Sequence, residues 1–264
     1  MRVPVVGTCR DVFYALLGVE WMITLVEREE QKELLLSLCA EDCFGCKISA
    51  VVKAYGFDKG FACFWLNEET RTVFCLADDV MLISGAIADA EEARQFLQML
   101  GVKTVHCSGE NGEKLGWTTV ESGEVLEKTA PAGEAVPATA EEVPIRELFS
   151  LLEEVGMVEE FEPFYLDLSH RLRHGASRAF WVRKEEKVAA CAIVSAIGEK
   201  GVILSAVAVR EDCRRQGLGR QLVGQVEEAF PGDAIYVFRE QGRHQEFYGG
   251  LGYTPVGAWV TVER

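Results

Sequence analysis

Three short segments of this 264-residue sequence recur in its second half, and this repeat limits the folds open to the chain. The first match pairs Phe64-Trp65-Leu66 with Phe180-Trp181-Val182, and the last pairs Leu115-Gly116-Trp117-Thr118 with Leu251-Gly252-Tyr253-Thr254. A third match lies between them. Because the matches keep one order, they indicate two copies of one supersecondary unit. The alternative is that a strand hairpin with an aromatic pair arose twice, since such residues favour pleated sheets anyway.

The alignment of the two copies places a connector between them. Residues 129–140 read TAPAGEAVPATA, a segment rich in Ala and Pro with few large apolar side chains. This composition is typical of an extended linker. The sequence therefore predicts a first domain over 1–128, a linker over 129–139 and a second domain over 140–264.

The second domain has the apolar spacing of a mixed α/β unit. We expect helices over 142–155 and 164–174, strands over 178–182, 188–195 and 202–209, a helix over 217–230, a strand over 234–238, a short helix ending at Tyr248, and a strand over 258–262. The third strand thus runs directly into a glycine turn and a helix. The predicted fold class is mixed α/β (α+β).

Charge and cysteine content narrow the classes of function. The net charge of -15 argues against nucleic-acid binding, because phosphate backbones are bound by basic surfaces. It suits a small cationic acceptor such as an amine, although it also serves solubility alone. Nine cysteines without a secretion signal favour free thiols in the cytoplasm. The apolar stretch Asp11–Val26 contains Glu20, so we expect a core helix there and no membrane span.

The segment from Val207 to Arg220 carries the strongest functional signal. It reads VAVREDCRRQGLGR, an apolar strand followed by a loop with two glycines that opens a helix. The first amides of a helix and its positive dipole end bind anions, and glycine lets the backbone approach closely. The loop also concentrates cations in an acidic chain, namely Arg210, Arg214, Arg215 and Arg220. It matches neither the dinucleotide fingerprint nor the P-loop. It predicts a site for a phosphate-bearing ligand, with an ordinary helix start and surface arginines as the alternative.

Two motifs resemble those of the GCN5-related N-acetyltransferase (GNAT) family. Its pyrophosphate-binding motif, Arg or Gln, two residues, Gly, one residue, Gly or Ala, is matched by Arg214, Gly217 and Gly219. Its aromatic-Tyr pair before a Leu-Gly-aromatic turn is matched by residues 247–253, which read FYGGLGY. The resemblance covers residues 140–264 directly and the first half through the repeat. It implies two GNAT-like domains, each a mixed, mostly antiparallel sheet flanked by helices, and acetyl-CoA as cosubstrate.

The resemblance also implies roles for individual residues. The cofactor's pantetheine arm would pair like an extra strand with the backbone at Val207, Ala208 and Val209. The pyrophosphate would lie beside Arg214 and on the loop amides, which are those of Arg215, Gln216, Gly217, Leu218, Gly219 and Arg220. Tyr248 matches the family's proton donor for the departing thiolate. The alternative is that Tyr248 only packs under the cofactor arm.

The sequence departs from the family pattern in two places. Gln241 stands where the family usually has Asn at the start of the short helix, and we expect it to contact the cofactor. The strand over 202–209 carries no acidic residue, although many members have a general base there. Glu240, His244 and Glu246 flank the predicted acceptor mouth and are candidate bases, with a solvated surface as the alternative.

The first copy lacks the residues that carry this chemistry. The alignment places Gly112 at the position of Tyr248, and residues 83–95 read ISGAIADAEEARQ, without a glycine loop. Asp89, Glu91 and Glu92 would cap that helix start and repel a pyrophosphate. We expect one cofactor per chain, and a first domain that is a scaffold or one wall of the acceptor site. The copies should form an internal pseudo-dimer, in a monomer or a weak homodimer.

Three cysteines and two histidines raise other possibilities. Cys39, Cys43 and Cys46 have the spacing of radical iron–sulfur enzymes, but no barrel pattern follows and no fourth zinc ligand is near. His170 and His174 lie one helical turn apart, where a helix-end role competes with metal binding. The resemblance to GNAT proteins thus implies an N-acetyltransferase that moves an acetyl group from acetyl-CoA to a small-molecule or peptide amine. The alternative is a non-catalytic CoA-binding or partner-binding module.

Overall fold

The computed structural model describes residues 22–137 and 141–264. They form two compact units. Unit 1 holds the described residues up to Glu124 together with Gly257–Arg264, and unit 2 holds Val125–Val256. Two long strands, β6 (Thr118–Thr129) and β11 (Thr254–Glu263), therefore begin in one unit and end in the other. The predicted domain borders follow the order of the chain, whereas the compact units exchange the ends of these two strands.

Unit 1 is a sheet with helices on both faces. Its strand order is β1-β2-β3-β4-β5-β11, in which β4 and β5 run parallel and the other neighbours pair antiparallel. Its elements are β1 (Ile23–Leu25), α2 (Glu29–Cys39), α3 (Cys43–Tyr55), β2 (Ala62–Asn67), β3 (Thr72–Ala77), β4 (Val80–Ser84), α4 (Ala90–Met99), β5 (Thr104–Ser108) and α5 (Gly109–Leu115), with the ends of β6 and β11. Within the described residues, no helix is long and apolar enough to cross a membrane.

The two aromatic residues of the repeat in unit 1, Phe64 and Trp65, pack on opposite faces of this sheet. Successive residues of a strand point to opposite faces. Phe64 therefore packs with α2 and α3, whereas Trp65 packs with Phe96 of α4, at 5.5 Å between ring centroids. Burial on each face stabilises the layer by about 2 kcal/mol per large side chain.

The core helix predicted over Asp11–Val26 is wrong where the structure describes it. Residues Ile23–Leu25 form β1, and Thr24 lies opposite Leu66 of β2. The β-branched Ile23 and Thr24 fit this pleated edge better than a helix. Residues 11–21 of that prediction lie outside the described part of the chain.

Unit 2 follows the predicted order of elements, and the mixed α/β class is confirmed. It contains α6 (Ile145–Glu154), α7 (Phe161–Arg173), β7 (Arg178–Lys184), β8 (Lys187–Ile197), β9 (Gly201–Val209), the 3-10 turn η1 (Glu211–Cys213), α8 (Leu218–Ala229), β10 (Ala234–Glu240) and α9 (Gln245–Gly249). Its strand order is β6-β10-β9-β8-β7. Helix α7 begins before the predicted 164, because Pro163 is tolerated in a first helical turn.

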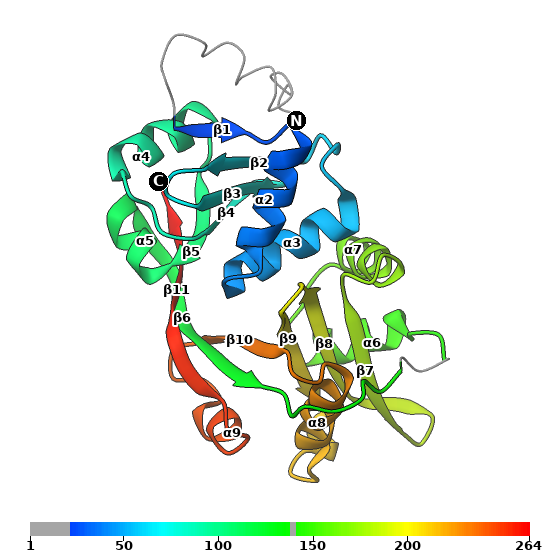
Figure 1. Cartoon of the computed structure of the whole chain (residues 1–264). Coiled ribbons are helices and arrows are strands. Elements are labelled where there is room, and N and C mark those ends of the chain that lie inside the picture. The colour runs from blue at the N-terminus through cyan, green and yellow to red at the C-terminus, as the bar shows by residue number, and fades with distance from the viewer. Residues whose placement is uncertain (1–21, 138–140) are drawn as a thin grey trace. The chain divides into compact units, whose positions relative to one another are not determined.

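The two halves of the chain repeat one order of elements, as Figure 1 shows along its colour scale. From α2 to β6, and again from α6 to β11, the order is two helices, three strands, a helix, a strand, a helix and a strand. The three sequence matches fall on corresponding elements, since Trp65 and Trp181 lie on β2 and β7 and Gly116 and Gly252 precede β6 and β11. This order is what a duplicated unit would produce.

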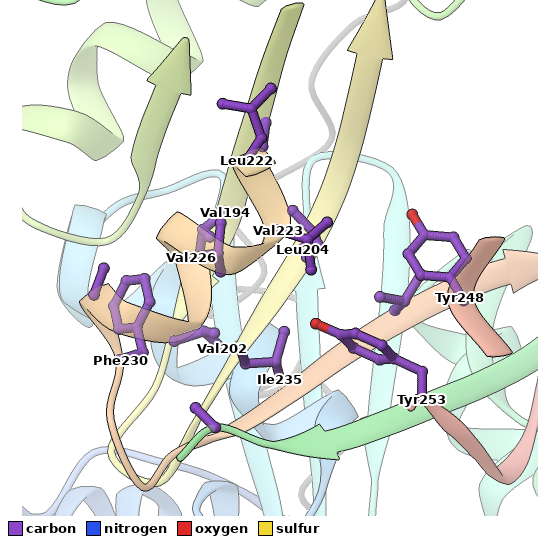
Figure 2. Close-up of a cluster of buried hydrophobic side chains, with 14 of the residues drawn as sticks. Val194, Val202, Leu204, Leu222, Val223, Val226, Phe230, Ile235, Tyr248 and Tyr253 are labelled. Atoms are coloured by element: carbon purple, nitrogen blue, oxygen red, sulfur yellow. The ribbon is translucent and has the colours of Figure 1, made fainter. Parts of the chain in front are cut away.

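The core of unit 2 joins α8 to the sheet and to α9 (Figure 2). Leu222, Val223 and Val226 form the buried stripe of α8, at the spacing of one helix face. They belong to the same buried cluster as Leu204 of β9 and Tyr248 of α9. This packing fixes the start of α8 beside the end of β9.

Candidate functional site

Strands β9 and β10 separate near the middle of β9. They pair in parallel from Gly201 opposite Ala234 to Ile203 opposite Tyr236. On its other side β9 remains paired with β8 as far as Val209, with register shifts beside Val194. In the part of the chain described, no pairing to β10 follows Ile203. The edge of β9 that carries Val207, Ala208 and Val209 is thus open to an extended ligand.

The loop after β9 ends in a helix start without a side-chain cap. Arg215 and Gly217 have φ angles of 59° and 81°, and Gly217 is the N-cap of α8. Within residues 22–137 and 141–264, the backbone N–H groups of Arg215 to Arg220 have no hydrogen-bond partner. Orphan amides at the positive end of a helix dipole form a site for an anion.

The arginines of this loop are not equivalent. Arg210 forms an ion pair with Asp212, at 2.7 Å between Nε and Oδ1. Arg214, Arg215 and Arg220 are exposed. Arg214 Nε donates to the Val209 carbonyl at 3.4 Å, and Arg220 donates to the Gly250 carbonyl at 3.4 Å. The last three arginines therefore keep guanidinium N–H groups available to an anion.

Two further loop residues show how the site is built. Gln216 accepts from Lys184 Nζ and donates to the Asp212 carbonyl at 3.3 Å, which ties the loop to β7. Gly219 is buried, and a Cβ there would lie 3.4 Å from the ring of Phe247. The first turn of α8 thus rests on α9, and the two sequence motifs meet in space.

Tyr248 presents a protonated hydroxyl beside this loop. Its ring is buried and packs edge-on against Tyr253, at 5.6 Å between centroids (Figure 2). Burial raises the pKa of Tyr248 to about 12, so the phenol keeps its proton at neutral pH. The Tyr253 hydroxyl is sealed in the core without a hydrogen-bond partner among the described residues, whereas the Tyr248 hydroxyl is not among the sealed atoms. Tyr248 can therefore donate a proton to a ligand.

Residues 176–255 match the family model of the acetyltransferase (GNAT) domain. Every predicted site residue, from Val207 to Tyr248, lies within this match. No curated protein matches the chain by sequence. The predicted resemblance to GNAT proteins is confirmed.

Solved GNAT proteins share the fold at low sequence identity. A GCN5-related N-acetyltransferase from Kribbella flavida is 19% identical with a TM-score of 0.52, and the match covers 73% of this chain and 86% of that one. One from Sphaerobacter thermophilus is 12% identical with a TM-score of 0.57, covering 94% and 96%. A tandem GNAT protein from the clavulanic acid biosynthesis pathway, without AcCoA, is 12% identical with a TM-score of 0.55, covering 91% and 98%.

The remaining polar candidates for cofactor contact or general base lie in or beside the turn between β10 and α9. Gln241 is exposed in this turn. Glu240 pairs with Arg243 at 2.8 Å, and the His244 carbonyl accepts the Tyr248 amide at 3.2 Å. Glu246 lies in the first turn of α9. The turn therefore offers both carboxylates and an imidazole, and none is singled out as a base.

Sequence reasoning missed one buried charged residue within the segment that matches the GNAT model. Arg239 is buried at the end of β10, on the strand face of Ile235 and Val237. The alternation of buried residues along β10 was the signal that could have found it.

Within the described residues, the cysteine and histidine candidates are not arranged as a metal centre. Cys39 ends α2, and Cys43 and Cys46 lie in the first turn of α3. All three side chains are buried. In the described residues, no three His, Cys, Asp or Glu side chains gather as metal ligands. His170 and His174 stack at 4.2 Å near the end of α7, and His174 Nδ1 lies 2.9 Å from the His170 carbonyl.

Proposed function

We propose that unit 2 is an N-acetyltransferase that moves an acetyl group from acetyl-CoA to an amine acceptor. The GNAT match supports acyl transfer in general. The observation that carries the specific proposal is the meeting of three features, the open edge of β9, the uncapped start of α8 and the Tyr248 hydroxyl. Each suits one part of a CoA thioester.

The backbone residues hold the cofactor in this proposal. Val207, Ala208 and Val209 pair with the amide groups of the pantetheine arm, as a neighbouring strand would. The amides from Arg215 to Arg220, with the guanidinium of Arg214, bind the pyrophosphate, and Gln241 contacts the arm. When bound, the cofactor supplies a thioester carbonyl activated for attack by an amine.

Tyr248 carries the proton transfer. An unprotonated amine attacks the carbonyl directly, a C–N bond forms and the C–S bond breaks, and the phenol of Tyr248 donates its proton to the departing sulfur. The proton that the amine nitrogen loses passes to solvent, which returns one to the phenol. Because burial holds the pKa of Tyr248 near 12, the donor form persists across the physiological range. The net charge of -15 favours approach of a cationic acceptor, which is a small molecule or a peptide.

We assign unit 1 the role of a scaffold or of one wall of the acceptor site in a cytoplasmic chain. The expected assembly is a monomer with an internal pseudo-dimer, or a weak homodimer. Nucleic acid and membrane are not among the expected partners.

Tyr248→Phe tests the proposal, because it removes the proton donor and keeps the ring. Acetylation of a panel of amines should fall by about a hundred-fold, as general-acid loss usually gives, while CoA affinity by calorimetry stays within about two-fold. Retained activity would assign Tyr248 to packing only. CoA binding without acetylation of any amine by the unmodified chain would favour a non-catalytic binding module.

A further inference from the structure

The tip of the β7–β8 hairpin lies beside the loop that opens α8. Strands β7, β8 and β9 are neighbours in unit 2 (Figure 1), and β8 pairs antiparallel with both others. Val182 of β7 and Val209 of β9 lie opposite the same residue, Ala190. The two strands therefore run towards the same edge of the sheet, and the hairpin extends past the last residue of β9. A hydrogen bond from Lys184 Nζ to the Gln216 side chain joins the two segments.

Lys184 carries a positive charge that no carboxylate balances within the described residues. Its side chain is half-buried, and its ammonium has one hydrogen-bond partner there, the neutral amide oxygen of Gln216. The neighbouring Arg183 differs, because its guanidinium donates to both oxygens of Glu147 at 2.6 and 2.8 Å. An ammonium has three N–H donors, so two of them remain for a ligand or water.

Arg215 adds a second cation next to Lys184. It directly precedes Gln216, its side chain is exposed, and no carboxylate pairs with it in the part of the chain that the structure describes. The carboxylates of the hairpin turn, Glu185 and Glu186, are exposed and form no ion pair with Lys184 among those residues. In a chain with a net charge of -15, two adjacent cations without such partners suit an anionic ligand group.

Coenzyme A carries more negative charge than the proposed pyrophosphate site binds. In that site the loop amides and Arg214 hold the pyrophosphate. The cofactor also carries a 3′-phosphate on its ribose, only a few bonds from the pyrophosphate. A phosphate monoester has a charge of about -1.5 to -2 at neutral pH and three strong acceptor oxygens. The hairpin tip offers the cations that such a group requires.

We propose that Lys184 and Arg215 bind the 3′-phosphate of coenzyme A, and that Gln216 positions Lys184 for this contact. The Gln216 amide donates to the Asp212 carbonyl at 3.3 Å, which turns its oxygen towards the ammonium of Lys184. This inference rests on the proposed function, since it concerns the same cofactor. It gives the chain a means to distinguish CoA thioesters from thioesters without a ribose 3′-phosphate, which the loop amides alone do not provide.

Calorimetry of the full chain with CoA and with 3′-dephospho-CoA tests this inference. The unmodified chain should bind CoA about thirty-fold more tightly than 3′-dephospho-CoA, because charged hydrogen bonds to phosphate are strong. Lys184→Gln should weaken CoA binding by about ten-fold and leave the affinity for 3′-dephospho-CoA within about two-fold. Arg215→Gln should narrow the same preference. Both effects should shrink as salt rises, since these side chains are at least partly exposed.

Lys200→Gln is the matched control for the loss of charge. Lys200 is exposed in the turn between β8 and β9, at the opposite end of the sheet, so both affinities should remain unchanged. A thermal melt checks that each variant folds. Equal losses for the two ligands in Lys184→Gln would overturn the inference, because they would assign Lys184 to the pyrophosphate, and so would unchanged affinities. If the unmodified chain bound neither ligand, the proposed function itself would fail, and this inference with it.

Discussion

Helices α4 and α8 follow corresponding strands of the two units and begin in opposite ways. At α4, the Asp89 side chain is the cap and accepts from the amides of Glu91 and Glu92 at 2.9 and 3.0 Å. At α8, Gly217 is the cap and offers no side chain. The first helix start is satisfied by its own carboxylate, whereas the second has no side-chain cap, which suits the pyrophosphate site that we propose. One order of elements thus supports a capped and an uncapped helix start.

The loops before these two helices also differ in whether a carboxylate accepts hydrogen bonds from them. Asp42 reaches the end of β4, where its carboxylate accepts from the Gly85 amide and the Ser84 hydroxyl, each at 2.9 Å. No carboxylate caps the corresponding loop after β9 in the described residues, since Asp212 pairs with Arg210. A carboxylate fixed at the first loop would repel a pyrophosphate.

The third difference between the units is the residue at the position of Tyr248, which in unit 1 is Gly112. A Cβ at Gly112 would come within 2.4 Å of Val260 Cγ2. The site has no room for even the first atom of a side chain, so no phenol can stand there. At these positions the described part of unit 1 therefore has neither an uncapped helix start nor a phenol.

Gly217→Asp would place a carboxylate at the start of α8, where α4 has Asp89, and it should have the largest effect. Calorimetry should find one CoA per unmodified chain and an affinity about a hundred-fold weaker in the variant, because the carboxylate repels the pyrophosphate. Gly217→Asn is the matched control. A Cβ at position 217 meets no atom within 4 Å, so Asn has the same shape and backbone cost without the charge. Equal losses in both variants, or two CoA molecules per chain, would break the comparison.

Gly112→Ala probes the closed position in unit 1. The overlap with Val260 should lower the free energy of unfolding by about 2 kcal/mol, as overpacking does. CoA affinity should not change. Urea unfolding measures the loss, and the double variant Gly112→Ala with Val260→Ala should recover most of it. No loss in the single variant would show that β11 shifts freely there.

Arg214→Glu should weaken CoA binding by about ten-fold, because it places an anion beside the pyrophosphate. The loss should shrink as salt rises, since Arg214 is exposed. Arg173→Glu on α7 makes the same change in net charge and serves as the control. Titration of both variants with CoA at two salt concentrations measures these losses. Equal losses of CoA affinity in Arg214→Glu and Arg173→Glu would contradict a specific contact of Arg214 with the pyrophosphate.

Tyr253→Phe should have the smallest effect. It removes a buried hydroxyl that has no partner among the described residues, so stability should be unchanged or higher by about 1 kcal/mol. Activity should persist, in contrast to Tyr248→Phe, which loses the same atom five positions earlier. A large drop in acetylation would mean that Tyr253 shares the proton transfer.

Local pattern predicted the elements of unit 2 well, because each has apolar residues at its own period. It also singled out the glycine loop and Tyr248 as candidates, because their motifs consist of residues adjacent in sequence. It could not find the separation of β9 from β10 or the contact of Gly219 with Phe247, since these depend on residues far apart in the chain. The error at Ile23–Leu25 has the same origin, because pairing with β2 overrode an apolar run.

The pairing of β5 with β11 determines when the sheet of unit 1 can be completed during synthesis. Strand β5 pairs with β11 from Ser108 opposite Trp259 to Thr104 opposite Glu263. A ribosome adds roughly 150 residues between these partners, which takes about 8 to 30 s at ordinary rates of translation. During that interval the β5 edge of the nascent chain lacks its final neighbour, and open strand edges attract other chains. The sheet of unit 1 therefore cannot be completed until β11 has been synthesised.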